Sequence, residues 1–132
     1  MPTTRRTLHE MRADHVEWSS TLDAWHEELA GLEEQLLATL DRARRPELRH
    51  DLLQFRDRFA RQRDLLEELR QMIRGHAARL APWTTGIPPA QADICHREHD
   101  VLRERMITAQ EVHTDLGRAC VLRLVHTRAS AR

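Results

Sequence analysis

The stretch that decides the fold runs from residue 8 to residue 36 and reads LHEMRADHVEWSSTLDAWHEELAGLEEQL. Its apolar residues recur at alternating spacings of three and four, a heptad pattern that continues over about four repeats. Such a pattern is typical of a long helix that packs against other long helices, as in a coiled coil. The inward stripe consists of Leu8, Met11, His15, Trp18, Leu22, Trp25, Leu29, Leu32 and Leu36.

Local signals set the ends of this helix. Thr7 and Glu10 match a capping box, in which each side chain accepts a hydrogen bond from the backbone N–H of the other residue. Pro46 ends the helix, because proline disrupts a helix interior but suits the first turn of the next helix. We therefore expect a helix over residues 7–43.

Two further heptad stripes follow, over residues 47–81 and 89–126. The segment 82–89, PWTTGIPP, separates them with three prolines and a glycine. The sequence therefore predicts an all-α fold, an antiparallel bundle of three long helices that dimerisation would complete to a larger bundle. Residues 1–6 are expected to be a disordered N-terminus, residues 7–126 one helical-bundle domain, and residues 127–132 a frayed basic tail.

Composition and charge limit the classes of function. The 132 residues carry 21 cations, all of them arginine, against 21 carboxylates, so no field of the whole chain favours nucleic acid or membrane. The arginines of residues 42–63 alternate with carboxylates, which is typical of a solvated helix face. No segment approaches the roughly 20 apolar residues of a membrane helix, and Met1–Glu10 lacks the apolar core of a signal peptide. We expect a cytoplasmic protein whose partner is a second copy or another helical protein.

The inward stripe of the third predicted helix contains side chains that can bind a metal. Cys95 and His99 are one turn apart and therefore stand on one face. Folding the chain between residues 45 and 46 places His15 opposite His76, and the longer loop places His76 level with Cys95 within about one turn. We expect His15, His76, Cys95 and His99 to converge at the end of the bundle near the proline-rich loop. Cys120 lies about 37 Å from Cys95 along one helix, so both thiols should be reduced.

Imidazole nitrogens and a thiolate are ligands that zinc or iron selects, and Asp14, Glu98 or Asp100 could orient an imidazole. The alternative is that these histidines are neutral and hydrogen-bonded within the core, as buried histidines more often are. Gln62 and His113 occupy inward positions too and are interpreted as polar residues that set the register of the helices.

Short matches suggest a resemblance to known proteins. The pattern His15-x-x-Trp18 and the segment from His99 to Met106 resemble a group of small uncharacterised bacterial helical-bundle proteins, a resemblance that implies no activity. Asp14-His15 and Glu98-His99 are also similar to haemerythrin-type helices, which implies His15 and His99 as iron ligands. The chain departs from that family, because His50-x-x-x-Gln54 stands where His-x-x-x-Glu is expected and no fourth helix is predicted.

The sequence favours a non-enzymatic protein. Cys95 and His99 have no glycine-rich turn or oxyanion donor beside them, and no glutamate stands on an inward stripe. We expect a homodimer or another protein–protein contact, because extra apolar residues widen the stripes, namely Leu37, Leu40, Leu53, Leu65 and Met72. Metal binding at the four-residue site is the alternative function.

Overall fold

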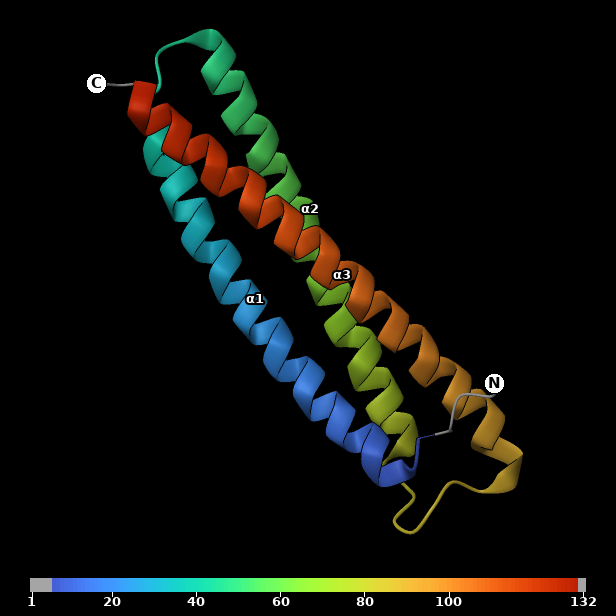
Figure 1. Ribbon diagram of the computed structural model, residues 1–132. Helices are drawn as coiled ribbons and strands as arrows, with labels where there is room; N and C mark the ends of the chain where they lie inside the picture. Colours follow the sequence, from blue (N-terminus) through green and yellow to red (C-terminus); the bar gives the residue numbers. More distant parts are fainter. Residues whose placement is uncertain (1–5, 131–132) are drawn as a thin grey trace.

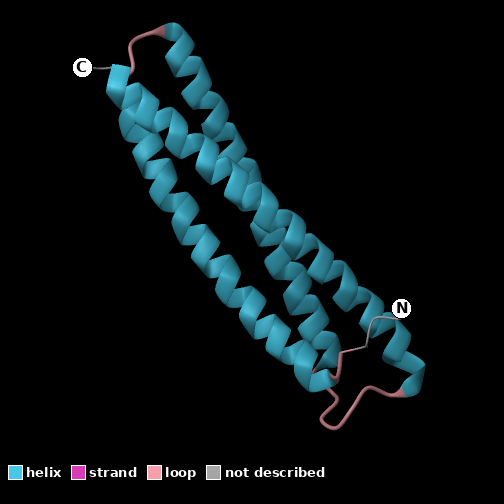
Figure 2. Cartoon of the chain, viewed as in Figure 1, coloured by secondary structure: helices cyan, strands magenta, loops and turns pink. Residues whose placement is uncertain are grey.

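The computed structural model describes residues 6–130, which form three long α-helices and contain no strand (Figures 1 and 2). Helix α1 covers Leu8–Arg42, α2 covers Pro46–Leu80 and α3 covers Pro89–Ser130. Each helix packs against both others, which confirms the predicted all-α bundle. A 35-residue helix is about 52 Å long, so the molecule is a rod. Within residues 6–130, no helix combines the length and the apolar character of a membrane span.

The helix ends agree with the predicted ends to within one residue, except at the end of α3. The capping box is present: Thr7 Oγ1 accepts from the Glu10 N–H at 3.1 Å, and Glu10 Oε1 accepts from the Thr7 N–H at 3.0 Å. Helix α3 continues to Ser130, whereas a frayed tail was expected from residue 127. Leu124 is still buried there and no proline follows, so nothing ends the helix earlier. Residues 131–132 lie outside the described part.

The disordered N-terminus that we expected over residues 1–6 falls mostly outside the described residues. Arg6 is described, and its guanidinium pairs with Glu10 at 3.3 Å and with Asp14 at 3.4 Å. The Arg6 carbonyl accepts a hydrogen bond from His96 Nε2 at 2.8 Å. The bundle therefore already includes Arg6, because this residue ties the start of α1 to α3.

Arginines from neighbouring segments satisfy the carbonyl groups at two helix ends. Arg49 donates to the Leu40 and Ala43 carbonyls at the end of α1, at 2.8 and 2.9 Å. Arg12 donates to the Leu80 and Trp83 carbonyls at the end of α2, at 2.9 and 2.6 Å. The last carbonyls of a helix have no partner within the helix, so these contacts stabilise both turns.

The core consists of two apolar clusters along the rod. The larger cluster extends from Leu22, Ile73 and Leu102 to the α1–α2 turn. The smaller cluster lies at the loop end and contains Leu8, Met11, Leu80 and Cys95, with Trp83 and Ile87 against it. Between the two clusters, the inward positions of all three helices are histidines.

Candidate metal centre

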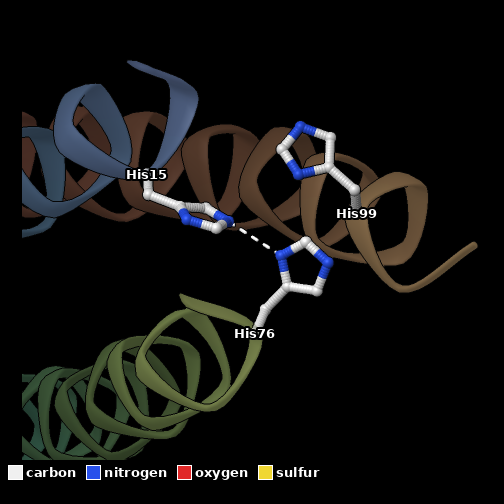
Figure 3. A group of neighbouring side chains, drawn as sticks. All are labelled: His15, His76 and His99. Carbon is white, nitrogen blue, oxygen red and sulfur yellow. Dashed lines mark hydrogen bonds between the residues drawn. The ribbon is translucent and has the colours of Figure 1, made fainter. Parts of the chain in front are cut away.

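His15 of α1, His76 of α2 and His99 of α3 form this polar layer, which we call the histidine layer. Their exposed fractions are 6%, 2% and 1%. The three imidazoles point toward one another from three different helices (Figure 3). One ring nitrogen from each residue lies within 4.8 Å of the other two. The sequence register therefore brings together three of the four residues predicted to form the site.

Hydrogen bonds fix the tautomers of His15 and His76. The Cys95 carbonyl can only accept, so His76 Nε2 carries the proton and donates to it at 3.0 Å. In a neutral His76 ring, Nδ1 then has a lone pair, which accepts from His15 Nε2 at 2.8 Å. The Cys95 backbone therefore turns the lone pair of His76 toward the centre of the layer.

His99 completes the layer with an unpaired nitrogen. Its Nε2 donates to Asp14 Oδ2 at 2.8 Å. Its Nδ1 is buried and has no hydrogen-bond partner among residues 6–130. Figure 3 shows one ring nitrogen of His99 facing the His15–His76 pair and the other facing away. A buried polar atom without a partner costs about 1–3 kcal/mol, and the Nδ1 of His113 is in the same state; what distinguishes His99 is that two further imidazoles lie beside its free nitrogen.

Burial keeps all three imidazoles neutral. It is the largest cause that lowers the pKa of His15 to about 4, and charges on His76 and His99 would lower this pKa further. Burial also lowers the pKa of His76 and of His99, although the hydrogen bond and the charge of Asp14 oppose the effect at His99. The neutral imidazole is the form that binds a metal, so protons compete little at pH 7.

The nitrogens would have to shift to hold a metal ion. Zinc binds imidazole nitrogens at about 2.0–2.1 Å, which places two ligands of a tetrahedral site about 3.4 Å apart. The 2.8 Å separation of His15 Nε2 and His76 Nδ1 would have to open by roughly 0.6 Å, and the proton of His15 would have to move from Nε2 to Nδ1. The three nitrogens, which lie within 4.8 Å of one another, would also have to draw together at His99. Trp18 stacks on His99 with ring centroids 4.8 Å apart, so an aromatic ring covers His99 against solvent.

Cys95 lies one turn closer to the loop than the histidine layer. Its side chain packs in the smaller apolar cluster, and burial raises the pKa of its thiol. The thiol is not grouped with the three histidines, whereas the Cys95 carbonyl orients His76. Cys95 and Cys120 are both free and buried, as expected for thiols far apart on α3.

Among the three carboxylates considered for orienting an imidazole, Asp14 is the one that contacts a histidine of the layer. Glu98 instead pairs with Arg79 at 3.0 Å, and Asp100 with Arg103 at 3.5 Å. The pair of Asp14 and His99 joins residues 85 positions apart, which a sequence pattern along one helix does not reveal.

A second polar layer repeats this arrangement two heptads along the bundle. His113 Nε2 donates to Glu28 Oε2 at 2.6 Å, and Trp25 stacks on His113 with centroids 5.3 Å apart. Gln62 donates to the Ala109 carbonyl at 3.4 Å, so it is tied to α3 in the same region. His113 follows His99, Glu28 follows Asp14, and Gln62 precedes His76, each by 14 positions. Sequence reasoning missed Glu28, although this common spacing of 14 is a signal that could have identified it.

No family model matches the chain, and neither the curated proteins nor the solved structures include a significant match.

Proposed function

We propose that the protein is a metal-binding three-helix bundle that holds one zinc or iron ion at His15, His76 and His99. The observation that carries this proposal is the buried, unpartnered Nδ1 of His99 beside a neutral pair of imidazoles. Three histidines and a fourth position open to water form a known zinc ligand set. Cys95 is left out of the proposed set, because its thiol belongs to the apolar cluster.

Two groups outside the ligand set support the proposal. Metal-bound histidines usually donate their second N–H to a carboxylate or a backbone carbonyl, which fixes the ring and raises its basicity. His99 has Asp14 in this role, and His76 has the Cys95 carbonyl. The ion would join all three helices at the level where the apolar core is interrupted.

Metal content and calorimetric titration test the proposal. We expect about one transition metal per chain after purification without chelator, and uptake of one Zn²⁺ by chelator-treated protein. His99→Leu should abolish uptake, whereas His113→Leu, the matched variant two heptads away, should keep it. Asp14→Asn should weaken zinc affinity about 10–100-fold. Protein that takes up neither Zn²⁺ nor Fe²⁺, or equal uptake by the two leucine variants, would refute this site.

Self-association is a second candidate function, and the outer face of α3 favours it. Among the described residues, seven of the nine exposed large hydrophobic side chains lie on α3: Ile94, Val101, Ile107, Val112, Val121, Leu122 and Val125. Five residues suggested a wide apolar face. Leu40 is buried, Leu53 and Met72 pack against the chain's own core, Leu65 is half-buried, and Leu37 is 41% exposed. The candidate surface therefore lies on α3 rather than along the α1–α2 pair.

A second copy of the chain is the proposed partner, and the association would be non-enzymatic. Burial of an exposed valine or leucine contributes about 25 cal/mol per Å² of apolar area. We expect a dimer in light scattering at high micromolar concentration, and Leu122→Glu should shift it to the monomer. Val16→Glu, at an equally exposed position of α1, is the control that should leave the dimer intact. A strict monomer under these conditions would remove this candidate.

A further inference from the structure

The end of the bundle opposite the histidine layer contains a cavity of about 580 Å³. It lies where the α1–α2 turn meets the last turns of α3, close together in Figure 1 near the label C. Along α2, this end is about 40 Å from His76, because Leu48 and His76 are 28 positions apart on that helix. The volume is within the range of about 300–1,000 Å³ that small-molecule sites occupy.

The lining of this cavity is strongly basic. Among the described residues, five arginines contribute to it against one carboxylate, that of Glu47; the arginines are Arg42, Arg44, Arg45, Arg123 and Arg128. The whole chain is neutral, with 21 charges of each sign, so this end concentrates positive charge locally. Like charges around a common cavity repel one another and attract a multiply charged anion.

Most of these guanidinium groups have no partner within the described residues. Arg63 pairs with Glu33 and Arg70 with Asp23 elsewhere in the bundle. The side chains of Arg42, Arg44, Arg45 and Arg128 make no hydrogen bond or ion pair with any residue in the range 6–130. Their donors therefore remain available to a ligand.

Two further features of the lining bear on an anion, the charge of Arg123 and the start of α2. Arg123 pairs with Asp51 through Nη2, and its buried Nε has no hydrogen-bond partner among the described residues, so the guanidinium keeps a donor that no carboxylate of residues 6–130 satisfies. Helix α2 begins at Pro46, and the preceding Arg45 provides no side-chain cap for its first N–H groups. Both features favour an anion, the second because a helix N-terminus carries partial positive charge.

We propose that this cavity binds a small molecule with two or more phosphate groups. Guanidinium groups bind phosphate oxygens in pairs of parallel hydrogen bonds, and several arginines can share the charge of one polyphosphate. A long nucleic acid fits less well, because Asp41, Asp51 and Asp57 alternate with the arginines along this part of the sequence. This site is independent of the metal proposal.

Calorimetric titration of the full chain with inorganic tripolyphosphate, in the presence of chelator, tests the site. We expect one tripolyphosphate per chain, with an affinity that weakens as salt increases. Arg44→Gln combined with Arg45→Gln should weaken binding at least tenfold, since both residues are exposed and lie in the turn. Arg61→Gln combined with Arg74→Gln removes the same charge from exposed positions of α2 outside this lining and should change the affinity less than twofold.

Three outcomes would overturn the proposal: no binding, an equal loss in both double variants, or affinity for single-stranded DNA that rises with its length while tripolyphosphate does not bind. Urea unfolding of each double variant checks that both remain folded. His99→Leu should bind tripolyphosphate as the wild type does, so a failure of the metal site and a failure of this site are distinguishable.

Discussion

Replacement of His76 by leucine separates a metal ligand from a tolerated polar residue. Without metal, His76→Leu removes the hydrogen bonds to His15 and to the Cys95 carbonyl and leaves the buried His15 N–H without an acceptor, which costs about 1–3 kcal/mol. The new leucine extends the apolar row of Ile73 and Leu80 and gains about 1.5–3 kcal/mol from burial. The two effects nearly cancel, so we expect the free energy of unfolding in chelator to change by less than about 1 kcal/mol.

With zinc, the two proteins should differ. Wild type gains about 2.7 kcal/mol when free zinc is a hundredfold above its dissociation constant. At a urea slope of about 1–3 kcal/mol per molar, this gain raises the unfolding midpoint by about 1–3 M. His76→Leu should gain little, because a site with two imidazoles binds zinc far more weakly than one with three.

The assay is urea unfolding followed by far-UV circular dichroism, for each protein with zinc and with chelator. Gln62→Leu is the matched control: it also replaces a buried polar residue on the inward stripe of α2, 14 positions away. It should keep the full zinc increment. If His76→Leu keeps that increment as well, or if wild type shows none in excess zinc, the metal site is refuted.

Three further predictions concern the metal-free protein. The pKa of His15 in the folded state is lowered from 6.5 to about 4, so its contribution to the free energy of unfolding should be complete above pH 6.5 and lost as pH falls from 6.5 to about 4, by roughly 3 kcal/mol. Urea midpoints across pH 3.5–8 measure this loss, and a flat profile would contradict it. Phe59→Ala should lower the free energy of unfolding by about 3–5 kcal/mol, since Phe59 is fully buried; a loss below 1 kcal/mol in urea unfolding would mean that this core is loosely packed. Arg12→Ala should lower the thermal midpoint, because charged hydrogen bonds of about 1.5–3 kcal/mol to the end of α2 are lost, whereas Arg74→Ala on the exposed surface should not.

The heptad stripes made the fold predictable from the sequence. The α1–α2 connection leaves almost no freedom of register, so His15 and His76 could be placed opposite each other, and they form a direct hydrogen bond. The loop before α3 is longer and leaves about one turn of slack. This slack is why the sequence could not decide whether Cys95 or His99 lies level with His76, and the structure places His99 there.

Contacts between α1 and α3 were the least predictable part of the candidate site. Asp14 was one of three carboxylates considered, and nothing along the chain distinguishes it from Glu98 or Asp100. Which carboxylate faces a histidine depends on the rotation of α3 about its own axis. The apolar stripe of a helix defines this rotation only to within about one residue. The pairing of His113 with Glu28 has the same origin, because two helices joined through a third have no direct connection to fix them.

The three histidines of the layer come from three different helices, which implies an order of assembly. The bond between His15 and His76 needs only the α1–α2 hairpin, whose short turn closes rapidly. The bond between His99 and Asp14 forms only when α3 docks, which requires closure over a much longer segment of chain. An ion that needs all three imidazoles would therefore act after docking, and we expect zinc to slow unfolding while leaving the folding rate nearly unchanged in stopped-flow experiments. The histidine layer would then hold the finished rod closed rather than guide its assembly.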